Sequence, residues 1–359
     1  MKKTLLTICL VWMCFSLSAQ KIIDLSGKWS FSIDRQDNGE KEKWFSHTLN
    51  DFINLPGSMP EKLKGDEVTA KTQWTGSLYD SSYYYNPYME KYRKEGNIKF
   101  PFFLTPDKHY VGAAWYQKEV NIPADWKGER ILLFLERPHI ETTVWVNGQK
   151  TGMQNSLCVP HQYDITRYVR PGKCTITIRV DNRIKEINVG PDSHSITDQT
   201  QGNWNGIVGR ICLQTTPKTY FDDIQIYPEP EQKLARVKVV IKGAGITKIK
   251  LSAESFNTDK KHIVPAIQQE IKLNKGVTET EMVLPMGNDM LLWDEFHPAL
   301  YKLKAEVTNG KKTEIKEIQF GMRRFEIKGK WFYVNGNKTQ LRGTVENCDF
   351  PLTGYAPMD

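Results

Sequence analysis

The chain has 359 residues, 39% of them hydrophobic and 25% charged, with a formal net charge of +7. That length and apolar content are enough for two or three domains with cores of their own. Lysine and arginine are interspersed with aspartate and glutamate, and no basic block is present that would follow a phosphate backbone, so the composition does not support nucleic-acid binding.

The first residues have the pattern of an export signal. Lys2 and Lys3 precede the apolar stretch 5–17, and small residues follow it. A membrane anchor is the alternative, but this apolar run is shorter than the roughly 20 residues that a span needs. We therefore predict that residues 1–19 are a signal peptide, that the protein is periplasmic or secreted, and that it has no membrane span.

The cysteines give no sign of a metal or cofactor site. Outside the predicted signal they are Cys158, Cys174, Cys212 and Cys348, without CxxC or Cys/His spacing. We therefore predict neither a bound metal nor a cofactor. Export permits disulfides, but these cysteines are scattered among strand-like segments, and buried free thiols are favoured over a disulfide framework.

From Ile22 on, short runs of β-branched and aromatic residues alternate with Gly, Asn, Asp and Pro, which predicts an all-β fold. Residues 131–135 predict one strand. Residues 143–146 predict another that ends in Asn147-Gly148, a sequence typical of a type I′ hairpin turn. Residues 175–180 alternate polar and apolar side chains, as a half-buried strand does. This pattern alone also fits a sandwich of unknown purpose.

The region between Pro56 and Gly112 has weak strand signals and a cluster of tyrosines at 83–85 and 88. Long connections of this kind often carry function. Tyrosines can stack on sugar rings, but packing of the loop onto its own domain is the favoured interpretation.

A Pro- and Glu-rich joint at 227–231 predicts a domain boundary. The segments after it with strand patterns are 235–241, 248–255, 279–284, 301–307 and 313–320. A domain of roughly ninety residues with short strands suits an immunoglobulin-like sandwich, although the cysteine pair of that fold is absent. We therefore predict one sandwich over residues 22–228 and a second over 229–321.

Motifs along the chain resemble glycoside hydrolase family 2, the family of β-galactosidases, β-glucuronidases and β-mannosidases. In the first predicted sandwich they are 112–120, 134–136, 144–148, 163–166 and the sequence GNWNGIVGR at 202–210. Their order is similar to that in the family's N-terminal sugar-binding jelly roll, and it is the shared order that makes the resemblance specific.

The remaining motifs resemble the end of the family's immunoglobulin-like domain and the entrance to its catalytic barrel. They are 292–301, FGMRRF at 320–325, the turn Asn335-Gly336 and Leu341-Arg342-Gly343. A (β/α)₈ barrel needs about 250 residues. Residues 322–359 are therefore predicted to be only the first strand or strands of a truncated barrel.

The resemblance implies an exported β-glycosidase that hydrolyses O-glycosyl bonds of an oligosaccharide or polysaccharide with retention. Retention uses two carboxyl groups about 5–5.5 Å apart, one as acid/base and one as nucleophile. In the family both follow the barrel entrance at a distance, so we expect both glutamates beyond Asp359 and no catalytic residue within the chain. The chain alone is therefore expected to be inactive.

Four residues are predicted to contact substrate. Trp204 and Asn205 lie on the loop that in the family reaches the barrel mouth, and Arg342 matches an Arg-Gly pair where a guanidinium can brace carboxylates. Many relatives have a sugar-contacting histidine where this chain has Asn347, which weakens a galactosidase assignment, although an amide can still bind hydroxyl groups. Trp204 as an ordinary core residue and Arg342 as a surface residue are the alternatives. The family's sugar-contacting aspartate is not transferred to Asp198, which is displaced in sequence.

The alternative function is a carbohydrate-binding protein without catalysis, and a third is an adaptor made of two sandwiches. The sequence does not distinguish the sugar or the linkage. It is compatible with a homo-oligomer.

Overall fold

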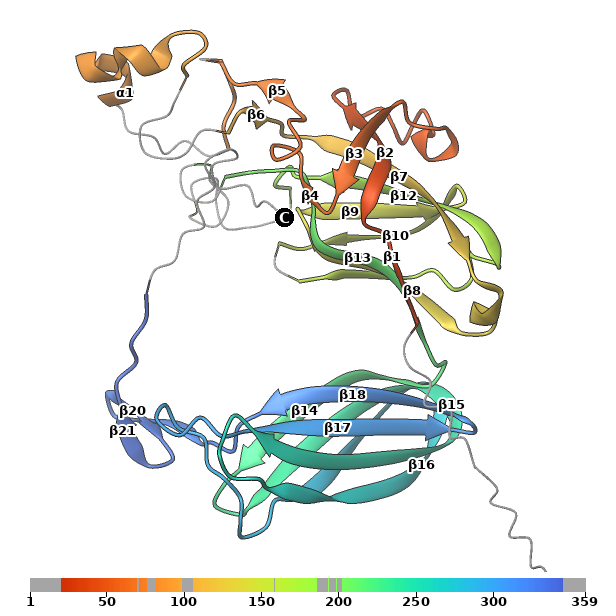
Figure 1. Ribbon diagram of the computed structural model, residues 1–359, viewed down its shortest axis with the longest axis vertical. Helices are drawn as coiled ribbons and strands as arrows, with labels where there is room; N and C mark the ends of the chain where they lie inside the picture. Colours follow the sequence, from red (N-terminus) through yellow and green to blue (C-terminus); the bar gives the residue numbers. More distant parts are fainter. Residues whose placement is uncertain are drawn as a thin grey trace, which may run out of the picture. The chain divides into compact units, whose positions relative to one another are not determined.

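The computed structural model describes residues 21–69, 71–75, 82–98, 106–157, 159–185, 193, 198 and 202–344. These residues are mostly β-strand and form two compact units, 21–216 and 217–342 (Figure 1). The predicted all-β fold is confirmed. Within the described residues, no helix has both the length and the apolar character needed to cross a membrane. The predicted signal peptide lies outside them.

The first unit is a sandwich of two antiparallel sheets, with strand orders β1-β13-β8-β11 (β4 also pairs with β13) and β10-β9-β12-β7-β2-β3. The strands of the first sheet are β1 (Ile22–Asp24), β4 (Gly57–Ser58), β8 (Arg130–Pro138), β11 (His161–Asp164) and β13 (Gly206–Thr216). Those of the second are β2 (Gly27–Asp34), β3 (Asp51–Leu55), β7 (Ala113–Ile122), β9 (Glu141–Val146), β10 (Gln149–Asn155) and β12 (Gly172–Asp181).

The core of this sandwich is formed by side chains that point alternately to the two faces of each sheet. On β12, Ile178 and Val180 are buried between the sheets, whereas Arg179 points to the other face of its sheet. That outer face is also covered, by the segment 35–50. An aromatic cluster fixes the segment there and consists of Trp44, Phe45, Trp115 and Trp145.

The predicted hairpin at Asn147-Gly148 is confirmed. Gln149 pairs with Val146, and the two turn residues have φ of 50° and 76°. Positive φ at both positions is what a type I′ turn requires.

Within its described residues, the connection between Pro56 and Gly112 contains only short elements. They are β4, β5 (Asp66–Glu67), α1 (Ser82–Tyr85), the 3₁₀ helix Pro87–Arg93 and β6 (Lys108–His109). Two further 3₁₀ helices of the first unit are Trp44–Ser46 and Ala124–Trp126. Tyr83 is buried and its hydroxyl donates to the Tyr92 carbonyl, as the packing interpretation expects. Tyr84, Tyr85 and Tyr88 are exposed.

The second unit is built on one long hairpin of β15 (Leu234–Phe256) and β16 (Ile263–Pro285). β14 (Tyr220–Glu229) pairs with the first half of β15, and β17 (Leu300–Asn309) pairs with the second half and with β18 (Lys312–Phe320). An apolar core joins side chains from all five strands. The segments 235–241 and 248–255, predicted as separate strands, are therefore parts of one strand.

The boundary between the units differs from the one predicted at 228. β14 pairs with β15 and so belongs to the second unit, and the division falls between residues 216 and 217. Pro228 and Pro230 lie where β14 ends and the chain turns into β15. Proline fits strand ends and turns because no ladder hydrogen bond is lost there, so here it marks a hairpin turn and not a linker.

A small sheet follows the second sandwich and consists of β19 (Phe325–Lys328), β20 (Trp331–Val334) and β21 (Asn337–Thr339). The Asn335 side chain donates to the Trp293 carbonyl at 2.9 Å and accepts from the Arg324 N–H at 2.8 Å. These bonds attach the sheet to the end of the sandwich. Residues 345–359 lie outside the described part, and the predicted barrel start stays a prediction.

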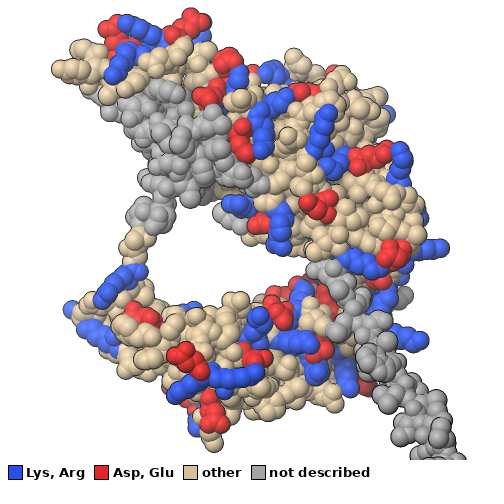
Figure 2. All heavy atoms as spheres, viewed as in Figure 1, with Lys and Arg blue, Asp and Glu red and all other residues tan. Residues whose placement is uncertain are grey.

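Cys174 and Cys212 are buried free thiols, as predicted. Burial raises the pKa of Cys174 to about 11, which keeps the thiol protonated at neutral pH. Cys158 and Cys348 lie outside the described residues. On the face shown in Figure 2, basic and acidic side chains alternate over both units.

Candidate functional site

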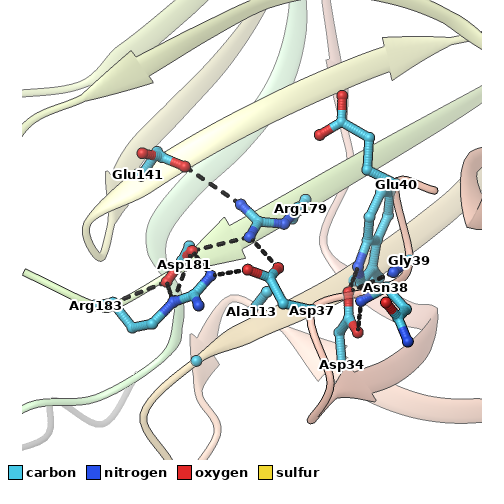
Figure 3. Close-up of polar contacts among 12 residues, drawn as sticks. Asp34, Asp37, Asn38, Gly39, Glu40, Ala113, Glu141, Arg179, Asp181 and Arg183 are labelled. Atoms are coloured by element: carbon cyan, nitrogen blue, oxygen red, sulfur yellow. Dashed lines mark hydrogen bonds and ion pairs between the residues drawn. The ribbon is translucent and has the colours of Figure 1, made fainter. Parts of the chain in front are cut away.

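One end of the six-stranded sheet carries a line of carboxylates. Asp34 at the end of β2 pairs with Ala113 at the start of β7, and Ala113 pairs with Asp181 at the end of β12. Asp181 in turn pairs with Glu141 at the start of β9. Directly paired residues point to the same face of a sheet. The carboxylates of β2, β12 and β9 therefore form one row, with Ala113 of β7 between Asp34 and Asp181 (Figure 3). This row, Asp34, Asp181 and Glu141, is here named the carboxylate row.

Arg179 neutralises part of this row. It lies two residues before Asp181 on β12 and so on the same face. Its guanidinium donates to Asp37 at 2.6 Å, to Asp181 at 2.9 Å and to Glu141 at 3.3 Å. The side chains of Arg179 and Asp181 are 8% and 0% exposed. Charges buried to this degree are costly without partners, and here they are matched.

Asp181 is the centre of the cluster. Besides Arg179, it accepts hydrogen bonds from Arg183 at 2.6 Å and pairs with Lys185 at 2.7 Å. Burial opposes its ionisation, but the hydrogen bonds from Arg183 and Lys185 and the charge of Arg179 hold the pKa of Asp181 well below its usual range. Asp181 is therefore an anion at neutral pH, which suits the orientation of cations and does not suit proton donation.

Asp34 shapes the turn that completes the cluster. Its carboxylate accepts from the backbone N–H groups of Asn38 and Gly39 and from Trp115 Nε1, each at 2.9 Å. A Cβ on Gly39 would lie 2.5 Å from Trp115 Nε1, so a larger residue cannot take this place without displacing the ring. The turn brings Asp37 to the two arginines (Figure 3).

The predicted site residue Asn205 is fully engaged inside the sandwich. It is 1% exposed. Its Nδ2 donates to the carbonyls of Gly112 and Val180 at 2.9 and 3.0 Å, and its Oδ1 accepts from the Tyr116 hydroxyl at 2.8 Å. These bonds tie β13 to the ends of β7 and β12. The structure therefore gives Asn205 an internal structural role.

Trp204 is also mostly buried. Its side chain is 8% exposed, stacks on His139 with ring centroids 4.5 Å apart, and packs on Val208. Burial lowers the pKa of His139 to about 3, so this imidazole is neutral beside the indole. The packing agrees with the alternative of a core tryptophan, and contact with a sugar stays a prediction.

Neither of the other two predicted residues belongs to the described part of the first unit. Arg342 is exposed and follows the small sheet of the second unit. Asn347 lies outside the described residues. Of the four residues predicted to contact substrate, only Trp204 and Asn205 can be compared within one unit, and these are neighbours in sequence; a shared site with Arg342 and Asn347 stays a prediction.

Asp198 is a buried carboxyl that joins two loops. It is 4% exposed and accepts from the backbone N–H groups of Thr75 at 2.5 Å and Asn203 at 2.6 Å. Burial raises the pKa of Asp198, and the neighbouring His109 opposes that rise. This residue therefore positions the loop that carries Trp204.

A cavity of about 530 Å³ with a mixed polar and apolar lining opens beside Asp34, at one end of the carboxylate row. Asp37 and Arg183, which are partners of the row, also line it, and Asp66 and Lys71 line it from the connection that follows β4. Two charged segments that are distant in sequence therefore share one concave surface.

The carboxylate row and the cavity were not predicted from the sequence. One local signal was present, because Arg179, Asp181 and Arg183 place charges at alternate positions at and just beyond the end of a strand that alternates polar and apolar side chains. Such charges must find partners if the strand is buried on both faces. Those partners, Asp37 and Glu141, come from distant segments.

Each of the two units is a domain built from β-strands around an apolar core of its own. The family description "Glycosyl hydrolases family 2, sugar binding domain" matches residues 22–217, and "Glycosyl hydrolases family 2" matches residues 219–323. The chain belongs to glycosyl hydrolases family 2. The two matches meet where the structure divides into its units.

The relatives include glucuronidases and galactosidases. The chain is 23% identical to a β-glucuronidase of Paenibacillus borealis over 355 residues (93% of this chain, 51% of that protein). It is 23% identical to human β-glucuronidase over 369 residues (92% and 49%). It is 25% identical to a β-galactosidase of Thermoanaerobacter pseudethanolicus over 281 residues (73% and 35%). The chain thus spans about half the length, or less, of these curated relatives.

Solved structures share the fold. A β-glucuronidase from Ruminococcus gnavus matches with a TM-score of 0.65 at 18% identity, covering 94% of this chain and 52% of that one. A β-glucuronidase from an uncultured Clostridium sp. matches with a TM-score of 0.63 at 22% identity, covering 95% and 51%.

Proposed function

We propose that the chain is the N-terminal part of an exported β-glycosidase that hydrolyses O-glycosyl bonds of glycans with retention of configuration. The observation that carries this proposal is the collinear family match over residues 22–323, which extends through both sandwiches. The relatives named as β-glucuronidases and β-galactosidases support a β-glycoside as substrate.

In this proposal the two catalytic carboxyl groups lie outside the 359 residues. Retention needs a protonated acid close to an ionised nucleophile. The central carboxylate of the row, Asp181, is held ionised by Arg183, Lys185 and Arg179. That chemistry suits the ordering of loops, and it does not suit protonation of a leaving group.

Activity assays test this function. Purified residues 20–359 are expected to show no hydrolysis of nitrophenyl β-glucuronide, β-galactoside or β-mannoside above background. Reading the gene past codon 359 and expressing any longer product is expected to give hydrolysis of at least one of them. Turnover by residues 20–359 would contradict the placement of the catalytic carboxyls.

The same assays separate the alternative function. A gene product that binds glycans but hydrolyses none of the three substrates would favour a carbohydrate-binding protein without catalysis.

Export is tested by mass spectrometry of the mature protein, whose N-terminus is expected at Gln20. A mature protein that retains Lys2 and Lys3 would contradict the export signal.

A further inference from the structure

The second unit has a long strand with one unpaired edge. β16 is a strand of 23 residues, and it pairs on one side with β15. Within the described residues, no other hydrogen bond reaches its main chain. In an antiparallel strand the N–H and C=O groups of alternate residues point to opposite sides. Alternate residues of β16 therefore present free main-chain groups, on which a further strand can pair.

Other edges of the two sandwiches are closed by side chains. In the second unit, the Phe221 N–H on β14 donates to Glu314, and the Phe221 carbonyl accepts from Lys316, both on β18 and both at 2.6 Å. In the first unit, the Gln154 amide on β10 binds both main-chain groups of Gln162 on β11, at 2.5 and 3.2 Å. These bonds occupy groups that a further strand would need. The outer edge of β16 has no closure of this kind in the described part of the chain.

The regular part of the β16 edge is short. β16 pairs with β15 without irregularity from Ile267 to Leu273, and the register shifts on both sides of this segment. Bulges bend an edge strand and limit how far a further strand can pair with it. Within the segment, Ile267 and Ile271 pack on the core of the unit but stay partly exposed. A strand that pairs here would therefore also cover apolar surface.

Two exposed charges flank Ile271. Glu270 and Lys272 point to the face of the sheet opposite to that of Ile271, because side chains alternate along a strand. Neither of the two has an ion-pair or hydrogen-bond partner within the described residues. Beyond the register shift, Glu279 of the same strand is paired with Lys238 at 2.7 Å. The charges beside the open regular edge are therefore available to another strand.

The order of these charges favours a second copy of the same strand. When two copies pair antiparallel about a two-fold axis, residues at equal distances from the central residue lie opposite each other. With Ile271 at the centre, Glu270 of each copy lies opposite Lys272 of the other copy. With Glu270 or Lys272 at the centre, two like charges meet. A slip by one residue would bring side chains of opposite faces together. Only the register centred on Ile271 pairs both charges.

We propose that the outer edge of β16 is an interface at which a second copy of this chain pairs antiparallel, centred on Ile271. Main-chain hydrogen bonds join the two sheets, and the Glu270–Lys272 ion pair forms twice because the interface is self-complementary. Ile271 of each copy is covered by that of the other. The regular segment is short, so the dimer belongs with the small and weak interfaces. The proposal does not depend on the proposed function.

Sedimentation velocity of the full chain over a concentration series tests for the dimer. The sedimentation coefficient of the wild type is expected to rise with concentration. Glu270→Lys and Lys272→Glu each place like charges opposite each other at both contacts, and each is expected to weaken the dimer by at least about tenfold. The matched control is Glu317→Lys, which reverses an exposed charge on β18 that is paired with Lys302. It is expected to leave the dimer unchanged.

Mixing the variants separates strand pairing from general effects of charge. An equimolar mixture of Glu270→Lys and Lys272→Glu again places opposite charges at both contacts, and so does the double variant with itself. Both are expected to dimerise as the wild type does, although each single variant does not. Hydrogen exchange of the wild type is expected to show protection of residues 269–273 that increases with concentration, and this increase is expected to be absent in the single variants.

Hydrogen exchange of the β17 amides monitors the fold of each variant. If a charge reversal loses protection there, Glu270→Gln takes its place, because it removes both ion pairs without adding a charge and should still weaken the dimer. A wild type that is monomeric at every concentration would overturn the interface. Equal association of the wild type and the folded single variants, or a mixture of folded variants that does not associate, would also overturn it.

Discussion

In the first unit, Arg179 and Asp181 form an ion pair whose side chains are 8% and 0% exposed. In the second unit, Lys261 and Glu254 form one whose side chains are 69% and 56% exposed. The same contrast holds for polar groups in general among the described residues. The buried ones of the second unit are Thr219 and Thr247, whereas the first unit buries carboxylates, a guanidinium group and several amides.

This difference in buried polar groups distinguishes what a β-sandwich requires to fold from what a functional site requires. The second unit shows that an apolar core with charges on the surface is sufficient for a β-sandwich. Buried ion pairs add little net stability over apolar packing, but they are costly to break. The carboxylate row is therefore best explained by the geometry that it and its arginine partners impose on Arg183 and on the turn at Asp37, which border the cavity.

The largest effect is expected from Asp181→Ala. It removes the shared partner of Arg179, Arg183 and Lys185 and leaves a buried guanidinium group with fewer partners, at a cost of about 3–5 kcal/mol. Hydrogen exchange should show this loss in the β7 and β12 amides, while β15 amides in the second unit stay unchanged. A loss below about 1 kcal/mol would mean that water replaces the carboxylate, and the contrast between the units would disappear.

The next largest effect is expected from acid, which should lower the free energy of unfolding of the first unit. The folded-state pKa of His139 is about 3, below the unfolded value of about 6.5. The unfolded chain therefore binds the proton first, and the contribution to stability is complete above pH 6.5 and is lost toward pH 3. The slope is up to about 1.4 kcal/mol per pH unit.

Urea unfolding between pH 7 and 4.5 measures this slope. His139→Phe keeps an aromatic ring against Trp204 and removes the titratable imidazole. It should therefore reduce the fall in unfolding free energy between pH 7 and 4.5. His161 is fully buried and its pKa is also lowered by burial, so part of the slope is expected to remain in that variant. An unchanged slope in His139→Phe would show that His139 does not contribute.

Asn205→Ala tests the internal role of a residue that the sequence predicted to contact substrate. It leaves the Tyr116 hydroxyl and the carbonyls of Gly112 and Val180 without their partner, at a cost of about 2 kcal/mol. Hydrogen exchange of the β13 amides gives the measurement. Unchanged protection together with weaker glycan binding would instead support the predicted substrate contact.

Local features of the fold were predictable because their chemistry is local. Asn147-Gly148 and Asn335-Gly336 both form tight turns with positive φ, as the sequence indicates. The boundary was misplaced because proline favours turns as well as linkers. β15 was divided in two because Gly243 and Gly245 interrupt its pattern, although the strand continues through them.

The site was predictable to a smaller extent, because its residues come together only through the register in which the strands pair. Asp34, Glu141 and Asp181 are neighbours only after β2, β7, β9 and β12 pair. The motif around Asn205 was recognised, but its hydrogen-bond partners come from two other strands. A motif shows that a residue matters to the family, whereas the hydrogen bonds of its side chain show how it acts in this chain.

The smallest effect is expected from the exposed pair Lys261–Glu254, whose atoms lie 3.1 Å apart. A double-mutant cycle with alanine at both positions should give a coupling of at most about 0.5 kcal/mol, because both groups are well solvated. Added salt should reduce it further. The matched cycle at Arg179 and Glu141, 3.3 Å apart with 8% and 12% of the side chains exposed, should give a larger coupling that salt changes less. Equal couplings and equal salt dependence would mean that burial does not distinguish the two units electrostatically, and the role assigned to the carboxylate row would have to be given up.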